Sequence, residues 1–96
     1  MWYILKYKKP ILATSDEYTK WYKKNPKQRI IKQEIVNNHK ISTVFLGLDH
    51  RYNEDVSILW ETMIFGKNYE DYQERYSSHK DAVIGHKKAA KIVLNE

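Results

Sequence analysis

The sequence contains no cysteine and only two prolines and three glycines. The lack of cysteine excludes a disulfide framework and every metal site built on thiolates, and it favours a reducing compartment such as the cytosol. The three glycines stand apart from one another, so the chain has no glycine-rich loop of the kind that cradles phosphates. The serines have neither a nucleophile-elbow context nor a neighbouring base, which leaves nucleophilic catalysis without support.

Long apolar runs are also missing. Lysines follow a very short apolar stretch in residues 1–10, the reverse of a secretory signal, and no segment approaches the length of a membrane span. We therefore expect a soluble protein of the cytoplasm. The 96 residues are expected to form a single domain, residues 1–96, with a thin core.

Charge is plentiful but unevenly distributed. The net charge is +5 at neutral pH; residues 1–40 hold ten Lys and Arg against three Asp and Glu, and residues 41–80 hold four against seven. A basic first half can face nucleic-acid phosphates or an acidic protein surface, whereas the acidic middle argues against uniform wrapping by nucleic acid. A lysine-rich surface without a specific function is the alternative interpretation.

Apolar periodicity and turn residues predict the fold class. Thr14 followed by Glu17, and Ser78 followed by Asp81, are typical of helix N-termini. The polar segment 67–78 is predicted to be a loop, and the second and third strands are predicted to form a hairpin. The predicted elements are strands over 2–13, 28–36, 41–50 and 58–65 and helices over 14–25 and 78–95. This order, β-α-β-β-β-α, indicates an α+β fold: an antiparallel sheet of about four strands with two helices packed on it.

Four ionisable side chains are directed toward the interior or its margin. His50 ends the third predicted strand, Glu61 interrupts the apolar fourth strand, and His86 lies within the apolar stripe of the last helix. An even-numbered connection between the two strands puts Glu61 on the face of His50. An odd-numbered connection or a bulge puts it beside Asp49. Either register brings a carboxylate to the Asp49–His50 corner.

These four residues are candidate metal ligands. A buried carboxylate must be protonated, paired or bound to a cation, because its burial alone costs several kcal/mol. Two imidazoles and one or two carboxylates are ligands that zinc and other divalent transition metals prefer. We therefore predict a structural zinc, or another divalent metal, held by Asp49, His50, Glu61 and His86 between the last helix and the sheet. The metal-free alternative is a hydrogen bond between Glu61 and His86.

Short motifs along the chain resemble those of a family of small proteins encoded in phages and prophages. The shared stretches are STVFLGLDH, ETMIFG, RYS and the GH of the last helix, and the N-terminal MWYI is also similar. The resemblance covers nearly the whole chain, and it favours the metal interpretation because all four candidate ligands fall within shared motifs. The connection RYNEDVS departs from the Gly/Pro-rich connection expected for the family. The resemblance implies a phage-borne protein that acts against host defences, similar to the anti-CRISPR proteins of type II-A systems.

The first interpretation of function is therefore a non-enzymatic inhibitor that binds a host RNA-guided nuclease and blocks target-DNA binding, in the cytoplasm of the bacterial host. The candidate contacts with the basic surface of such a nuclease are acidic: Glu54, Asp55, Glu70, Asp71 and Glu74. A small metal-dependent nuclease or phosphodiesterase is a second interpretation, although four candidate ligands leave few groups for catalysis. The third is a binding module that sequesters a nucleotide or contacts nucleic acid through its basic half, where KWYKKNPKQR (20–29) mixes basic and aromatic residues.

Overall fold

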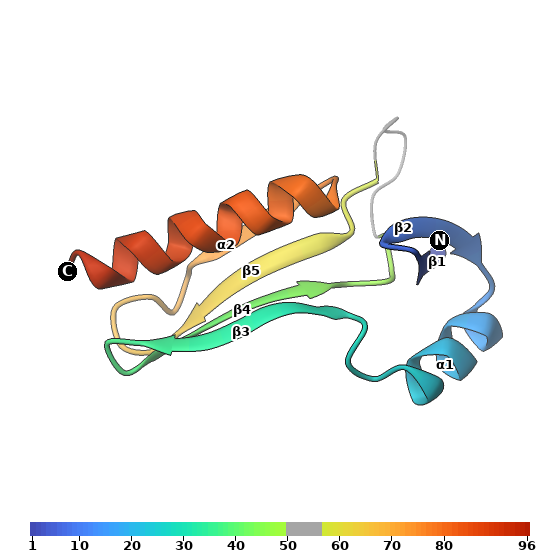
Figure 1. Cartoon of the computed structure of the whole chain (residues 1–96), viewed down its shortest axis with the longest axis horizontal. Coiled ribbons are helices and arrows are strands. Elements are labelled where there is room, and N and C mark those ends of the chain that lie inside the picture. The colour runs from blue at the N-terminus through green and yellow to red at the C-terminus, as the bar shows by residue number, and fades with distance from the viewer. Residues whose placement is uncertain (50–56) are drawn as a thin grey trace.

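The computed structural model describes residues 1–49 and 57–96, and these residues form two sheets and two helices (Figure 1). In chain order the elements are β1 (Trp2–Lys6), β2 (Lys9–Ala13), α1 (Ser15–Lys24), β3 (Ile30–Val36), β4 (His39–Phe45), β5 (Trp60–Phe65), β6 (Gln73–Tyr76) and α2 (His79–Leu94). The predicted α+β class, with a four-stranded antiparallel sheet and helices, is confirmed.

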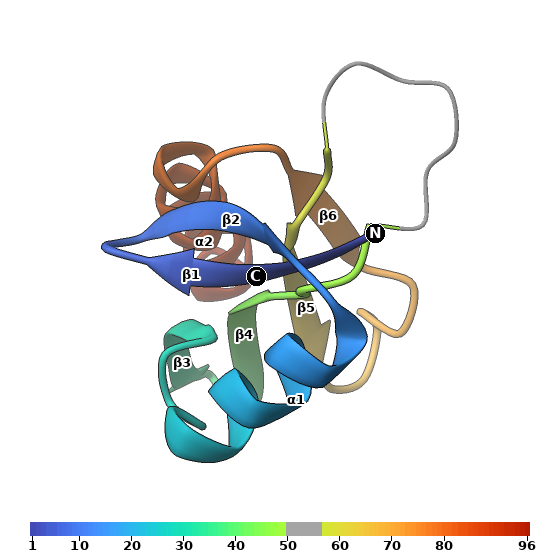
Figure 2. The ribbon, with the colours of Figure 1, turned by 90° about the vertical axis from the view of Figure 1, so that its right-hand side faces the viewer.

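The larger sheet has the strand order β3-β4-β5-β6 and is antiparallel throughout. The predicted hairpin of β3 and β4 is present. Its turn residues, Asn37 and Asn38, have φ of 48° and 66°, and two left-handed residues give a two-residue turn the twist that a hairpin needs. α2 begins at the predicted cap, where Ser78 accepts a hydrogen bond from the backbone of Asp81. It lies along one face of the sheet and contacts all four strands (Figures 1 and 2).

The N-terminal segment differs from the single strand predicted for it. Residues 2–13 form an antiparallel hairpin, β1 with β2, which is a separate two-stranded sheet. Its turn residues, Tyr7 and Lys8, have φ of 52° and 66°, conformations that are uncommon outside glycine and asparagine. The hairpin lies at one end of the larger sheet (Figure 1), where the N–H of Tyr3 donates to the carbonyl of Gly47 at 2.7 Å.

The second difference from the predicted elements is β6. This strand lies within residues 67–78, which were predicted to be a loop. In the β5–β6 pair, Glu61 lies opposite Arg75 and Trp60 lies opposite Tyr76. β6 is polar because it is a short edge strand with a charged outer face. Its composition therefore lacks the apolar alternation that identifies a half-buried strand.

α1 begins with the predicted capping box. The Thr14 hydroxyl accepts from the backbone N–H of Glu17 at 3.1 Å, and the Glu17 carboxylate accepts from the N–H of Thr14 at 2.9 Å. The helix lies beside the N-terminal hairpin, at the end of the larger sheet (Figures 1 and 2). Trp21 connects it to that sheet through an edge-to-face contact with Phe45, with ring centroids 6.0 Å apart.

The hydrophobic core lies between α2 and the larger sheet and extends toward the hairpin. Its largest fully buried apolar side chains are Trp60, Phe45, Ile41, Leu59 and Val93. Each such side chain contributes about 1.5–3 kcal/mol through the apolar surface that it removes from water, so this layer fixes α2 on the sheet. Neither helix in residues 1–49 and 57–96 has the length and apolar character needed to cross a lipid bilayer.

Candidate functional site

His86 lies at the centre of a chain of polar contacts between α2 and the sheet, and only 3% of its surface is exposed. Its Nδ1 is 2.7 Å from the Thr43 Oγ1, which is 2.6 Å from the Thr62 Oγ1. Its Nε2 is 2.9 Å from the Glu34 carboxylate. Because an ionised carboxylate only accepts, the imidazole donates from Nε2 to Glu34. The hydroxyls of Thr43 and Thr62 continue the chain of hydrogen bonds from Nδ1. We call Glu34, His86, Thr43 and Thr62 the His86 network.

The order carboxylate, imidazole, hydroxyl is also the order found around an activated nucleophile. Thr43 and Thr62, however, are completely buried beneath α2, with 0% of their surface exposed. A substrate therefore cannot reach the Thr43 hydroxyl. Each contact instead gives a buried polar group the hydrogen bond that it needs, and together they join α2 to β3, β4 and β5.

The outer end of the His86 network reaches solvent at Glu34, where 30% of the side chain is exposed. The hydrogen bond from His86 lowers the pKa of Glu34, and the Lys32 ammonium group, 3.5 Å from the carboxylate, acts in the same direction against the effect of partial burial. Glu34 is therefore ionised at neutral pH and is a firm acceptor for the imidazole N–H.

The residue before His86 in α2 is a glycine, Gly85, because Tyr76 leaves no space for a side chain at this position. Tyr76 of β6 lies directly against Gly85, and a Cβ at this position would overlap the phenol ring and its hydroxyl. Burial against the helix raises the pKa of Tyr76. The GH pair thus has two structural roles, since the glycine admits Tyr76 and the histidine bonds to the sheet.

Glu61 does not meet His86. In the β4–β5 register, Val44 lies opposite Glu61 and Thr43 lies opposite Thr62. Successive residues of a strand face opposite sides of the sheet, so Thr62 faces α2 and Glu61 faces away from it. Glu61 and His86 therefore do not point into one interior as predicted, and the predicted hydrogen bond between them is replaced by bonds to Arg75 and Glu34.

Glu61 is paired on the other face of the sheet by two residues of β6. Its Oε2 accepts from Arg75 Nε at 2.9 Å and from Gln73 Nε2 at 2.7 Å. Only 8% of Glu61 is exposed, so the guanidinium group compensates a carboxylate that is nearly buried. Arg75 therefore supplies the positive charge that the nearly buried carboxylate of Glu61 needs.

Asp49 lies at the margin of the fold. The N–H of Asp49 donates to the carbonyl of Met1 at 3.0 Å, which places Asp49 beside the N-terminus. His50 lies outside the described residues. Within residues 1–49 and 57–96, no three His, Asp or Glu side chains gather closely enough to hold a metal ion. Zinc binding that involves His50 stays a prediction, which elemental analysis of protein purified without a histidine tag tests.

Three of the predicted partner-binding acids, Glu70, Asp71 and Glu74, are exposed. The first two lie on the segment between β5 and β6, and the third lies on β6. Glu54 and Asp55 fall outside the part of the chain that the structure describes. The three exposed carboxylates define what we call the acidic segment, residues 70–74.

The acidic segment is presented by a turn that is tied to the core. The N–H of Tyr69 donates to the carbonyl of Gly66 at 3.3 Å, and that of Tyr72 donates to the carbonyl of Tyr69 at 3.0 Å. Both tyrosines pack against the buried cluster beneath α2. This packing restricts the backbone on either side of Glu70 and Asp71, so their carboxylates project from a fixed support.

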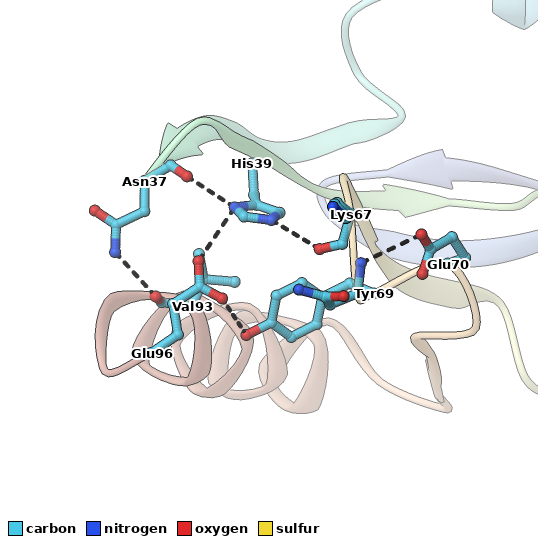
Figure 3. A network of polar contacts seen from close by, with 8 residues as sticks. Asn37, His39, Lys67, Tyr69, Glu70, Val93 and Glu96 are labelled. Carbon is cyan, nitrogen blue, oxygen red and sulfur yellow. Dashed lines mark hydrogen bonds and ion pairs between the residues drawn. The ribbon is translucent and has the colours of Figure 1, made fainter.

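A polar network at the C-terminal end of α2 adds a second anchor (Figure 3). The ring of His39 lies 3.1 Å from the Lys67 carbonyl and 2.8 Å from the Asn37 carbonyl, and these two hydrogen bonds raise the pKa of His39. The Glu96 carboxylate, 3.5 Å from the ring, raises it further. Glu96 also accepts from the Tyr69 hydroxyl at 2.9 Å. The β3–β4 turn, the β5–β6 connection and the end of α2 are thereby joined.

Sequence reasoning missed Glu34, Thr43, Thr62 and His39. A signal for Glu34 existed in the alternation of β3, which places Glu34 on the same face as the apolar Val36. The two threonines follow from the β4–β5 register once it is known. Comparisons with protein-family models, curated proteins and solved structures found no match.

Proposed function

We propose that this protein is a non-enzymatic inhibitor of a bacterial defence system, an anti-CRISPR protein that binds an RNA-guided nuclease in the host cytoplasm and stops it from binding target DNA. The motif resemblance to small phage proteins suggests the setting. The observation that carries the proposal is the acidic segment, whose three carboxylates are exposed, two on a turn that packs against the core and the third on β6.

Electrostatics explains why such a segment suits this partner. RNA-guided nucleases hold nucleic acid in positively charged channels, and an acidic protein surface can occupy such a channel in place of a phosphate backbone. Opposite charges accelerate the encounter and fix its orientation. A support that is already rigid reduces the entropy lost on binding, and here Tyr69 and Tyr72 provide that support.

The polar interior is consistent with a protein that acts through its surface. The ionisable residues of the His86 network and the Glu61–Arg75 pair are of the types that catalyse reactions or bind metals. Each of them forms a hydrogen bond within the fold. The buried imidazole and carboxylates therefore hold the sheet, the helix and the edge strand in place. The exposed groups remain available for a partner.

The proposal is tested by measuring the binding of fluorescent target DNA to a purified, guide-loaded type II nuclease. Saturating wild-type protein should abolish DNA binding. The variant Glu70→Lys/Asp71→Lys/Glu74→Lys should lose this effect and keep its circular dichroism spectrum and melting temperature, since all three residues are exposed. Unchanged DNA binding in the presence of the wild-type protein, for nucleases of several type II systems, refutes the proposal.

A matched variant at the other end of the molecule is the control. Lys20→Glu/Lys23→Glu also reverses exposed charges, but on α1. It should inhibit the nuclease as well as the wild type does. Loss of inhibition in this variant alone would assign the contact to the basic half and contradict a role for the acidic segment.

A second candidate function, binding to single-stranded nucleic acid, is favoured by the turn of the N-terminal hairpin. Tyr7 is 90% exposed between Lys6 and Lys8, and a hollow of about 570 Å³ separates this turn from α1. An exposed aromatic ring between ammonium groups suits base stacking with neighbouring phosphates. Binding to a labelled oligothymidine should then weaken steeply with added salt and weaken further in Tyr7→Ala. No measurable binding at low salt excludes this function.

A further inference from the structure

A groove runs between the edge strand β3 and α2, with a cavity volume of about 460 Å³. Its floor and walls are aliphatic, formed by Ile31 and Val36 of β3 and by Val83, Ala90 and Leu94 of α2. The groove is therefore an apolar surface that the fold leaves open at one side of the helix, and its volume lies in the range of ligand-binding clefts.

Positive charge borders this apolar surface. Lys32 of β3 and Lys87 and Lys91 of α2 line the groove. One carboxylate, Glu34, also lies in the lining, but it is already engaged by His86 at 2.9 Å and by Lys32 at 3.5 Å. The unbalanced charge at the rim is positive, so the groove complements an occupant that is apolar along one side and anionic at its edges.

The shape of the groove suits an extended chain. On β3 the lining residues run from 31 to 36, and on α2 they run from 83 to 94. At about 3.3 Å per residue in a strand and 1.5 Å per residue in a helix, both stretches are about 16 Å long. That length accommodates about five residues of an extended peptide.

β3 also has an unused pairing edge. Within the described residues it pairs with β4 alone and forms the border of the sheet. Ile35, on the side of β3 away from α2, is 68% exposed, and Leu94, at the end of the groove, is 62% exposed. An added strand would satisfy the backbone of β3 and cover aliphatic surface on both of its faces.

We propose that the groove between β3 and α2 binds an extended acidic peptide segment of a partner protein, which adds to β3 as a fifth strand of the sheet. The side chains of the peptide that face α2 are every second residue of the added strand. This face carries apolar groups, which lie against Val83 and Ala90, and carboxylates, which meet Lys87 and Lys91. This site lies on the opposite edge of the sheet from the acidic segment of β6, so it serves a contact separate from the one proposed for the nuclease.

A second copy of this chain is the less favourable occupant of the same edge. Pairing β3 with its own copy would bring Lys32, Lys87 and Lys91 of each chain toward the same residues of the other. Like charges across an interface cost binding energy.

The test uses an octapeptide with threonine at every odd position and valine and glutamate in turn at the even positions, so that one strand face carries both apolar and acidic groups. The peptide is labelled with fluorescein and titrated with the full chain by fluorescence anisotropy. Saturable binding is expected. A peptide with proline at a central valine should bind at least about tenfold more weakly, because proline removes a strand donor. The same peptide with lysine in place of each glutamate should not bind.

Protein variants locate the site. Lys87→Glu/Lys91→Glu should weaken binding of the valine–glutamate peptide by about tenfold or more, equivalent to about 1.4 kcal/mol. Lys88→Glu is the matched control, since Lys88 is adjacent in sequence but lies outside the groove, and it should change affinity by less than about twofold. Ala90→Trp should fill the groove and abolish binding without lowering the helix content.

Several results would overturn the proposal. These are the absence of peptide binding at millimolar protein, equal binding of the proline-containing peptide, and equal weakening by Lys88→Glu, which would indicate unspecific charge attraction. Light scattering that shows a dimer, converted to a monomer by Ala90→Trp, would assign the groove to a second copy instead.

Discussion

Replacing Thr43 by valine should destabilise the protein far more than the size of the change suggests. Valine has nearly the shape of threonine, so packing in the completely buried site is preserved. The substitution removes the hydroxyl that lies between His86 and Thr62, at 2.7 Å and 2.6 Å. Two buried polar atoms, the His86 Nδ1 and the Thr62 Oγ1, lose their shared partner.

The expected cost follows from these two atoms. Each buried group left without a hydrogen bond costs about 1–3 kcal/mol, and the added methyl group of valine returns about 0.8 kcal/mol. The free energy of unfolding should therefore fall by roughly 1–5 kcal/mol, a large share of the roughly 5–15 kcal/mol available to a domain of this kind. The melting temperature should fall by about 4–8 °C for each kcal/mol.

Urea unfolding followed by circular dichroism measures this cost. The double variant Thr43→Val/Thr62→Val is informative because it removes the orphaned Thr62 hydroxyl and leaves only His86 unsatisfied. It should therefore be no less stable than Thr43→Val alone, with a coupling of about 1–2 kcal/mol between the two sites. Thr19→Val, at an exposed position of α1, is the control and should change stability by no more than about 0.5 kcal/mol.

Two outcomes would refute the reasoning. The first is a loss below about 0.5 kcal/mol in Thr43→Val, since a satisfied buried network cannot lose its central hydroxyl at so small a cost. The second is strict additivity of the Thr43 and Thr62 substitutions, which would show that the two hydroxyls do not depend on each other.

Three further substitutions probe other parts of the fold. Gly85→Ala should lower the melting temperature although alanine is the better helix former, because its Cβ would overlap Tyr76; an unchanged or higher value contradicts the contact. Arg75→Met should cost about 1–3 kcal/mol in urea unfolding by leaving the nearly buried Glu61 carboxylate unpaired, and the cost should shrink in a Glu61→Gln background. The third concerns pH. Because the folded-state pKa of His39 is raised, its protonated ring stabilises the fold fully below the unfolded pKa of about 6.5 and loses this effect as pH rises through the folded value. The stability advantage of the wild type over His39→Gln should thus shrink above pH 6.5, and a constant difference would contradict the assignment.

Local signals predicted the elements that depend on neighbouring residues. Thr14 with Glu17, and Ser78 before the last helix, set helix starts that the structure confirms, because caps form within a few residues of one another. The Asn37–Asn38 turn likewise set the β3–β4 hairpin. The inward direction of His86 was also predicted correctly, since it follows from the apolar stripe of a single helix.

Features that depend on distant parts of the chain could not be predicted in this way. The face of Glu61 depended on the β4–β5 register, and the connection between these strands carries no turn signal that sets it. His86 does bond to a carboxylate, as the metal-free alternative expected, but the carboxylate is Glu34. The reversal at Tyr7 has no glycine or asparagine to mark it. These choices are made by tertiary packing, which outweighs local preference.

We propose that this chain acts on a nuclease through the acidic segment. Hydrogen–deuterium exchange of the chain, free and bound to a guide-loaded type II nuclease, tests this most directly. Complex formation should slow amide exchange most strongly in residues 68–76. Exchange that is unchanged throughout, or slowed only in residues 1–29, would contradict the proposal.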